Sequence, residues 1–356
     1  MPKHKRWVLL ANWMDRTMLR NAVALNIAHR VDSAYVNTEG DYTGGIAWSP
    51  RGTSVEVIMD GRHVGNYFLC EQIKIDGDRV DIKDCIEDII DDGNANPTMA
   101  DCGYLLEFDD NYDEVDKFRT GRGLPCMFKD EVSKYSSDIY NQVKARIEAV
   151  ESNLEAGNYE AAYNDLDINS VIDYFFIQEL TFNDEYKHPK SVYMLIDGDG
   201  KLTAGPVWDF DWQTFINYDK VQAMNSKYGG TYSCRNTNEW LYGKSKLAEW
   251  HIIGGYDYEN DMPYMWYPLL FKDANFRARV QERWTVIYPQ LLSVVAKIDE
   301  FAALNKVSEQ FNYAMWPLVG LKNSVGSAFN GDEDMSFDEA IATMKQAYTE
   351  RLEWMN

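Results

Sequence analysis

Alternating apolar and polar residues predict strands in the first third of the chain. Residues 6–11, "RWVLLA", form a short apolar run that is typical of a buried strand. Residues 54–75 alternate on both sides of Asp60-Gly61, a dipeptide that favours a tight hairpin turn. We therefore expect a two-stranded hairpin there, and further strands at 103–109 and 125–130.

Helical spacing appears first at residues 15–31 and dominates the second half of the chain. In residues 15–31 an apolar stripe falls on one helix face, with Asp15 or Thr17 as the N-cap. Residues 136–156 and 168–182 predict two helices joined by a turn near Gly157. From Trp266 onward the pattern is helical to the end of the chain.

Two segments between these helices have a different pattern. Residues 190–212 predict a hairpin whose turn is "DGDG", at 197–200, whereas residues 213–262 lack clear periodicity and are expected to be loop-like. The order of elements predicts an α+β protein, with a small N-terminal sheet region and a larger helical C-terminal region. We place the boundary between a sheet-rich part, 1–135, and a mainly helical part, 136–356.

Composition narrows the class of protein. The chain has 356 residues, a hydrophobic content of 45% and a formal net charge of −22. This predicts a packed core and makes nucleic acid an unsuitable partner, because nucleic-acid binding needs a basic surface. No apolar run reaches the roughly 20 residues of a membrane span. The first residues do not form a secretory signal, so we expect a cytoplasmic protein unless a leader precedes them, in which case a secreted or cell-envelope protein is expected.

Common catalytic and metal-binding motifs are missing from the sequence. The five cysteines have no C-x-x-C spacing, and the five histidines are scattered. "DGDGK" resembles the start of a calcium loop, but the sixth and twelfth positions are Leu202 and Trp208 instead of Gly and Glu. A tight hairpin turn is the favoured interpretation of this stretch.

One acidic stretch remains as a candidate site. "PVWDFDW", residues 206–212, places Asp209 and Asp211 among aromatic residues, and "NDE", residues 183–185, lies about 25 residues earlier at the end of a predicted helix. Phosphoryl transfer uses one carboxylate to orient the attacking hydroxyl and another to bind Mg²⁺. The alternative interpretation of Asp209 and Asp211 is a solvated turn.

Several segments, in the same order, resemble the spore coat protein CotH kinase family. "WVLLANWMDRTMLRN", "VEVIMDGRHVGNYFLCEQIKIDGDRVDI", "CGYLLEFD", "YFFIQELTFNDEYKHPKSVYML" and "PVWDFDW" match family segments along most of the chain. The resemblance implies an atypical, minimal protein-kinase-like fold that uses ATP and Mg²⁺ to phosphorylate hydroxyls of a protein substrate. Residues 1–135 then form the nucleotide-facing lobe, and 183–212 form the catalytic hairpin.

The resemblance also assigns roles to individual residues. Asp209 falls on the metal-binding Asp of the family's W-D-x-D segment, with Asp211 as a second metal or supporting carboxylate. The catalytic base falls on Asp184 or Glu185, and Ser191 takes the position where many relatives carry a metal-binding Asn. The remaining assignments, to the nucleotide-binding surface, are Glu71, Lys74 and Glu107, with a possible ion pair between Glu71 and Lys74 or, alternatively, a solvated strand end.

Two departures from the family pattern qualify the expected activity. Aligning on Asn183 puts Glu185 at a base position that is usually Asp, and a Glu carboxylate reaches about one carbon further. The family's upstream R-G-N-S-type segment and Lys-bearing strand do not precede "PKHKRW", so we expect an incomplete nucleotide lobe. The alternative functions are a pseudokinase or structural coat protein and, from the aromatic segment 213–262, a carbohydrate-binding module.

Overall fold

The fold combines two antiparallel sheets with a helical body, as an α+β prediction requires. The computed structural model describes residues 5–33, 45–46, 48–183, 189–228, 265–320 and 330–356. The strands in these ranges are β1 (Trp7–Leu10), β2 (Gly52–Met59), β3 (Arg62–Glu71), β4 (Gly103–Phe108), β5 (Lys117–Arg119), β6 (Pro125–Phe128), β7 (Val192–Asp197) and β8 (Leu202–Ala204).

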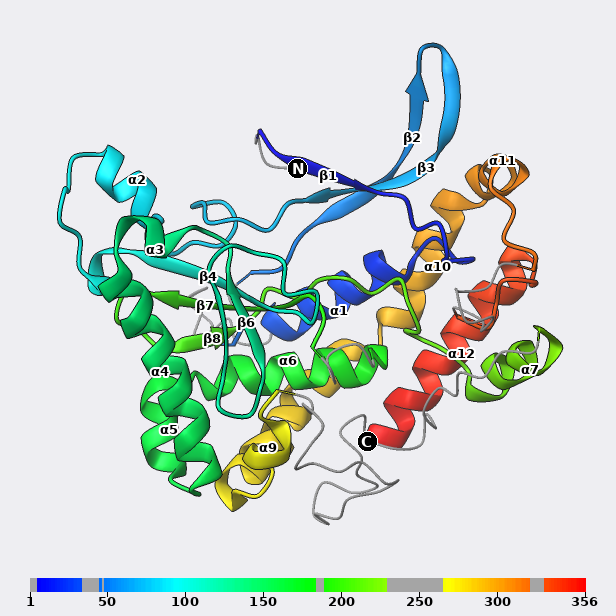
Figure 1. The fold of residues 1–356 in the computed structure, drawn as a ribbon. Helices are drawn as coiled ribbons and strands as arrows, with labels where there is room; N and C mark the ends of the chain where they lie inside the picture. The colour runs from blue at the N-terminus through cyan, green and yellow to red at the C-terminus, as the bar shows by residue number, and fades with distance from the viewer. Residues whose placement is uncertain (1–4, 34–44, 47, 184–188, 229–264, 321–329) are drawn as a thin grey trace.

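The first sheet, called the N-terminal sheet, has the order β1-β3-β2. The predicted hairpin at 54–75 is confirmed by the antiparallel pairing of β2 with β3. Asp60 and Gly61 form its turn with positive φ angles of 51° and 75°, the conformation that this dipeptide tolerates best. Figure 1 shows this hairpin projecting from the body of the molecule.

The second sheet, called the central sheet, has the order β5-β6-β4-β7-β8. The predicted strands at 103–109 and 125–130 become β4 and β6, and the hairpin at 190–212 becomes β7 and β8. The turn between β7 and β8 is tight, because Gly198 has φ +60° and Gly200 N–H bonds to Asp197 C=O at 2.9 Å. Although the sequence-based boundary lies at 135, β7 pairs with β4 across it.

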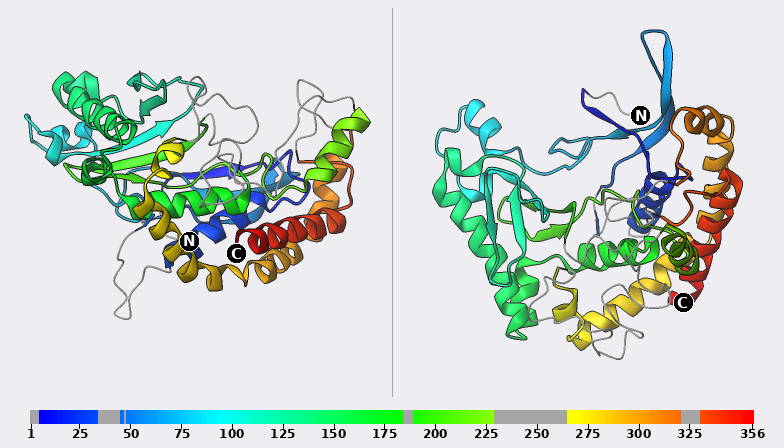
Figure 2. Two further views of the ribbon diagram at one scale, coloured as in Figure 1. Left: turned by 90° about the horizontal axis from the view of Figure 1, so that it is seen from below. Right: turned by 45° about the vertical axis from the view of Figure 1, so that its right-hand side comes forward.

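Helices form the rest of the described structure. They are α1 (Arg20–Ser33), α2 (Ile86–Asp91), α3 (Val132–Tyr135), α4 (Ser137–Glu155), α5 (Tyr159–Asp165), α6 (Ile168–Thr181), α7 (Tyr218–Tyr228), α8 (Tyr267–Leu270), α9 (Ala274–Leu291), α10 (Val294–Asn305), α11 (Ser308–Met315) and α12 (Phe337–Met355). The predicted helices 136–156 and 168–182 are confirmed as α4 and α6. Figure 2 shows α9, α10 and α12 together along one side of the molecule.

Three sequence-based expectations are corrected by the structure. The first helix begins at Arg20 and not at residue 15, because the Asp15 carboxylate accepts N–H groups of Thr17 and Arg20 and so closes a turn before the helix. The connection after Gly157 contains a further helix, α5. Part of the 213–262 segment is helical, as α7, while residues 229–262 lie outside the described structure.

The core lies between the central sheet and a layer of packed helices. Helix α6 is buried along almost its whole length and packs against α1, α9, α12 and β8. At the β5–β6 side of the central sheet, Tyr140 of α4 packs its ring against Phe118 and Phe128. Within the described ranges, no helix has the length and apolar character that crossing a bilayer requires.

Candidate active site

Asp209 and Asp211 lie on the loop that follows β8, and their carboxyl groups are close enough to influence each other's pKa. Asp209 has φ +64°, a left-handed conformation that costs an L-residue about 1–2 kcal/mol. The buried rings of Phe210 and Phe215 flank this part of the loop. Asp209 and Asp211 are half-buried beside these rings, so the loop is not the fully solvated turn considered from sequence.

Burial and neighbouring negative charges raise the pKa of both aspartates. Burial is the largest cause for Asp211, followed by the charges of Asp209 and Asp15, and together they raise its pKa to about 7. Burial and the charge of Asp109 raise the pKa of Asp209, against the opposing effects of Asp211, Lys190 and Ser191. Ionising both carboxyl groups at once costs free energy unless a cation lies between them.

Ser191 completes this acidic cluster. Its side chain lies close enough to Asp209 to lower the pKa of that carboxyl, and its backbone N–H donates to Asp109 Oδ2 at 2.9 Å. Ser191 has φ +51°, so a second residue of the site is held in the left-handed region. Lys190, the preceding residue, approaches Asp109 Oδ1 with its Nζ atom at 3.9 Å. The three residues assigned to metal binding, Asp209, Asp211 and Ser191, are thus brought together.

The expected base residues lie outside the described residues, directly after Asn183. Asn183 itself is buried, and its Nδ2 atom donates to Asp209 C=O at 3.2 Å. The end of α6 is therefore joined to the loop that carries Asp209. Asp184 and Glu185 follow Asn183 in the chain, and their assignment as candidate bases stays a prediction.

The donors in this cluster suit a hard divalent cation. Mg²⁺ prefers carboxylate oxygens and usually keeps several water or phosphate ligands. Asp209 and Asp211 supply two carboxylates and Ser191 a hydroxyl, and a cation between the carboxylates would balance their negative charge. Among the described residues, no group of three or more His, Cys, Asp or Glu side chains could hold a metal alone, so substrate or water would complete the shell.

Side chains from distant segments hold the backbone of this loop. Asn21 Oδ1 accepts Phe210 N–H at 2.9 Å, and Arg20 Nε donates to Thr214 C=O at 2.9 Å. On the other side, Asn330 donates to Asp211 C=O at 3.0 Å and accepts Gln213 N–H at 2.6 Å. The loop is therefore fixed by the start of α1 and by the turn before α12.

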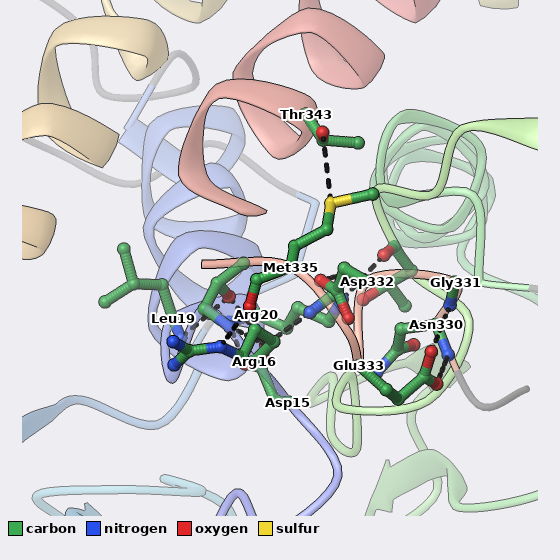
Figure 3. Close-up of polar contacts among 12 residues, drawn as sticks. Asp15, Arg16, Leu19, Arg20, Asn330, Gly331, Asp332, Glu333, Met335 and Thr343 are labelled. Carbon is green, nitrogen blue, oxygen red and sulfur yellow. Dashed lines mark hydrogen bonds and ion pairs between the residues drawn. The ribbon is translucent and has the colours of Figure 1, made fainter. Parts of the chain in front are cut away.

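A buried ion-pair network lies behind these contacts. Arg20 pairs with Asp15 and, at 2.7 Å, with Asp332, and all three side chains are almost completely buried. Figure 3 shows Arg20 between the two aspartates, with Asn330 and Glu333 beside them. The network positions Asp15 close enough to raise the pKa of Asp211.

A cleft of about 1010 Å³ lies beside the loop, between the N-terminal sheet and the central sheet. Trp208, the residue before Asp209, lines this cleft together with Tyr193 of β7. The residues of the N-terminal side are Lys5, Arg6, Val8, Gln72, Ile73, Lys74, Ile75, Asp76 and Asp78. The cleft is large enough for a ligand of nucleotide size.

The predicted nucleotide-facing residues occupy different positions around this cleft. Lys74 lines it and donates to Asp76 Oδ2 at 2.9 Å. Glu71 is fully buried and pairs with Arg51, so the possible ion pair between Glu71 and Lys74 is replaced by two separate pairs. Glu107 is hydrogen-bonded to Lys129 and is the cross-strand partner of Tyr193, and both of these residues line the cleft.

The residues that sequence reasoning missed are mostly polar groups from other parts of the chain. They are Asp15, Arg20, Asn21, Asp109, Lys129, Tyr193, Asn330 and Asp332. Asp109 stood in the quoted "GYLLEFD" segment, so its place after a buried strand was an available signal. For Asn330 and Asp332 the sequence offers no signal, because their role depends on a contact more than a hundred residues away.

Comparison with known families identifies the family of this chain. The family model described as "CotH kinase protein" matches residues 1–355. A search of curated proteins finds no match to the chain. Because the family model covers almost the entire length, the resemblance seen in the separate segments extends over the whole fold. The chain belongs to the CotH kinase family.

Proposed function

We propose that this protein transfers phosphate from Mg-ATP to serine or threonine hydroxyls of a protein substrate. The observation that carries the proposal is the half-buried cluster of Asp209, Asp211 and Ser191 next to a cleft of nucleotide size. Membership of the CotH kinase family supports a kinase-like domain. ATP, Mg²⁺ and the protein substrate belong to the proposal.

The residues of the candidate site would have separate roles in phosphate transfer. Mg²⁺, when bound, would neutralise negative charge on the phosphates. Asp209 and Asp211 would hold the ion, with the Ser191 hydroxyl as a third donor. Asp184 or Glu185 would accept the proton of the attacking hydroxyl, since both directly follow Asn183, which is bonded to the Asp209 backbone.

Rigid support of the Asp209 loop favours a site that performs chemistry. Catalytic groups act best when their position is fixed before the substrate binds. Asn21, Arg20, Asn183 and Asn330 hold the loop backbone from three directions. Left-handed backbone at Asp209 and Ser191 is strain of the kind that clusters at active sites.

The test compares Asp209→Asn with wild type in a phosphate-transfer assay with labelled ATP and a serine-rich acceptor protein. We expect transfer to fall by more than about a hundredfold, because the loss of one metal-binding carboxylate costs several kcal/mol of transition-state stabilisation. Asp199→Asn is the matched control, since Asp199 is an exposed aspartate in the β7–β8 turn, at the opposite end of this hairpin from Asp209. Equal transfer by Asp209→Asn and wild type would contradict the proposal.

A pseudokinase is the second candidate function. The observation that favours it is the Glu at one of the two base positions and the Ser at position 191, which is a poorer metal ligand than an amide oxygen. Wild-type protein that binds Mg-ATP but transfers no phosphate to any acceptor would support this alternative and overturn the enzymatic proposal.

A further inference from the structure

Helix α11 covers an edge of the N-terminal sheet. Strand β1 pairs with residues 68–71 of β3, and α11 packs on β3 beyond that pairing (Figure 1). There Asn312 Oδ1 accepts Asn66 N–H at 3.0 Å. Trp316, directly after the helix, donates from Nε1 to Val64 C=O at 3.1 Å. Backbone groups at a sheet edge need such partners, so α11 continues the cover that β1 begins.

The helix and the strand approach each other closely. Gly65 has φ +132°, and a Cβ atom there would lie 2.9 Å from Asn312 Oδ1 and 3.3 Å from Trp316 Nε1. Asn66 adds a side-chain bond, since its Nδ2 atom donates to Ser308 Oγ at 2.9 Å. Asn66 and Asn312 are 4% and 6% exposed, so water competes little for these bonds. The β2–β3 hairpin is therefore docked on α11 by buried polar contacts.

The residue after Asn312 contacts the segment that connects β1 to α1. Tyr313 O–H donates to Asp15 C=O, and the Arg16 guanidinium lies 4.2 Å from the centre of the Tyr313 ring. Arg16 also pairs with Glu309 of α11 at 3.4 Å. One helix therefore holds the N-terminal sheet through Asn312 and the segment after β1 through Tyr313.

The same region of the chain is bonded to the loop after β8, which carries the candidate metal site. Arg20, at the start of α1, donates from Nε to Thr214 C=O at 2.9 Å. A single amide, Asn330 Nδ2, donates to Met14 C=O at 3.1 Å and to Asp211 C=O at 3.0 Å. A continuous set of contacts therefore runs from the hairpin through α11 to the loop after β8.

We propose that Asn312 and Tyr313 are positioning residues of the candidate active site, and that α11 sets the spacing between the N-terminal sheet and the loop after β8. The inference rests on the proposed function, because it takes Mg-ATP from that proposal as the ligand that spans the two parts. The cleft has the N-terminal sheet on one side and Trp208, which leads into this loop, on the other. A ligand that contacts both sides binds best when their spacing is correct before it arrives.

The test compares binding of Mg-ATP and of adenosine to Asn312→Ala and to Tyr313→Phe. Alanine removes the acceptor of Asn66 N–H, and phenylalanine removes only the hydroxyl that donates to Asp15. Adenosine has no phosphates and cannot contact a metal ion at the loop, so it does not depend on the spacing. We expect each variant to lose about tenfold in Mg-ATP affinity, measured by isothermal titration calorimetry. Adenosine affinity, measured by ligand-observed NMR, should stay unchanged.

Gln310→Ala is the matched control, because Gln310 is an exposed residue of the same helix. This variant should bind both ligands like wild type. If either Asn312→Ala or Tyr313→Phe binds Mg-ATP like wild type, the inference is overturned. Equal losses of Mg-ATP and adenosine affinity would also overturn it, because the two contacts would then only maintain the fold.

The inference and the proposed function can fail separately. If both variants lose Mg-ATP affinity selectively while wild type transfers no phosphate, the inference stands and the proposed transfer activity fails. If wild type transfers phosphate and both variants keep its Mg-ATP affinity, the proposed function stands and the inference fails. If wild type does not bind Mg-ATP, both are overturned.

Discussion

At the residue scale, the site depends on carboxylates that repel each other. Asp209 and Asp211 share a half-buried position, and Asp15 and Asp109 add further negative charge from the segment before α1 and from the end of β4. Such a cluster destabilises the folded protein unless a cation or a proton balances it. A metal-binding site is expected to carry this cost, because a bound cation balances the carboxylates and so removes the repulsion between them.

We predict that Asp211→Asn makes the metal-free protein more stable and less responsive to Mg²⁺. Removing one of two facing carboxylates relieves repulsion of roughly 1 kcal/mol, so the melting temperature in EDTA should rise by about 1–2 °C. The stabilisation that wild type gains from Mg²⁺ should shrink in the variant. Differential scanning calorimetry with and without Mg²⁺ measures both effects.

The exposed residue Asp199 again provides the control for this measurement. Asp199→Asn should change neither the melting temperature in EDTA nor the Mg²⁺ response, because it lies in a solvated turn. A lower melting temperature for Asp211→Asn in EDTA would show that the carboxylate stabilises the fold and does not serve as a ligand.

At the element scale, local sequence signals located most helices and strands but not all their ends. The capping residues decide these ends: Ser136 caps α4, Asp167 caps α6 and Ser336 caps α12 through side-chain hydrogen bonds. Asp15 could be recognised as a capping residue, but its two carboxylate oxygens close a turn that delays α1 until Arg20. Short helices such as α5 were missed, because seven residues are too few for a periodic pattern.

We predict that Ser336→Ala destabilises the protein by about 1 kcal/mol, the usual cost of a lost N-cap. Ser336 Oγ accepts Glu339 N–H, and the Glu339 carboxylate accepts Ser336 N–H at 2.9 Å. These two bonds form a capping box at the start of α12. Urea unfolding followed by circular dichroism measures the change.

A hydroxyl within the same helix serves as the comparison. Thr349 Oγ1 donates to Lys345 C=O, a carbonyl that already belongs to the helix, so Thr349→Ala should cost less than Ser336→Ala. Equal losses for the two variants would mean that the cap does not carry the stability of α12.

At the scale of the whole molecule, buried ion pairs join helices that are distant in sequence. Arg351 of α12 pairs with Glu179 of α6 at 2.6 Å, and Arg283 of α9 pairs with Asp173 of α6 at 2.8 Å. All four side chains are nearly inaccessible to solvent. Because α6 leads into Asn183 and the expected base residues, these pairs fix the helix that presents this part of the site.

We predict that Arg351→Met destabilises the protein by about 3–5 kcal/mol, because it leaves the buried Glu179 carboxylate without its partner. The double variant Arg351→Met with Glu179→Met should recover much of that loss, since it removes the stranded charge as well. Chemical denaturation of both variants measures the difference. If the double variant is less stable than Arg351→Met alone, packing and not charge explains the loss.

The sequence by itself determined the class of fold, the main hairpins, the long helices and the two aspartates of the candidate metal site. These features depend on local periodicity, on turn dipeptides and on the order of segments, all of which are readable along the chain. Tertiary structure decided which distant groups surround them: Asn330 and Arg20 at the Asp209 loop, and Lys129 with Glu107 at the cleft. Such partnerships depend on how the strands pair and the helices pack, and no spacing within the sequence encodes them.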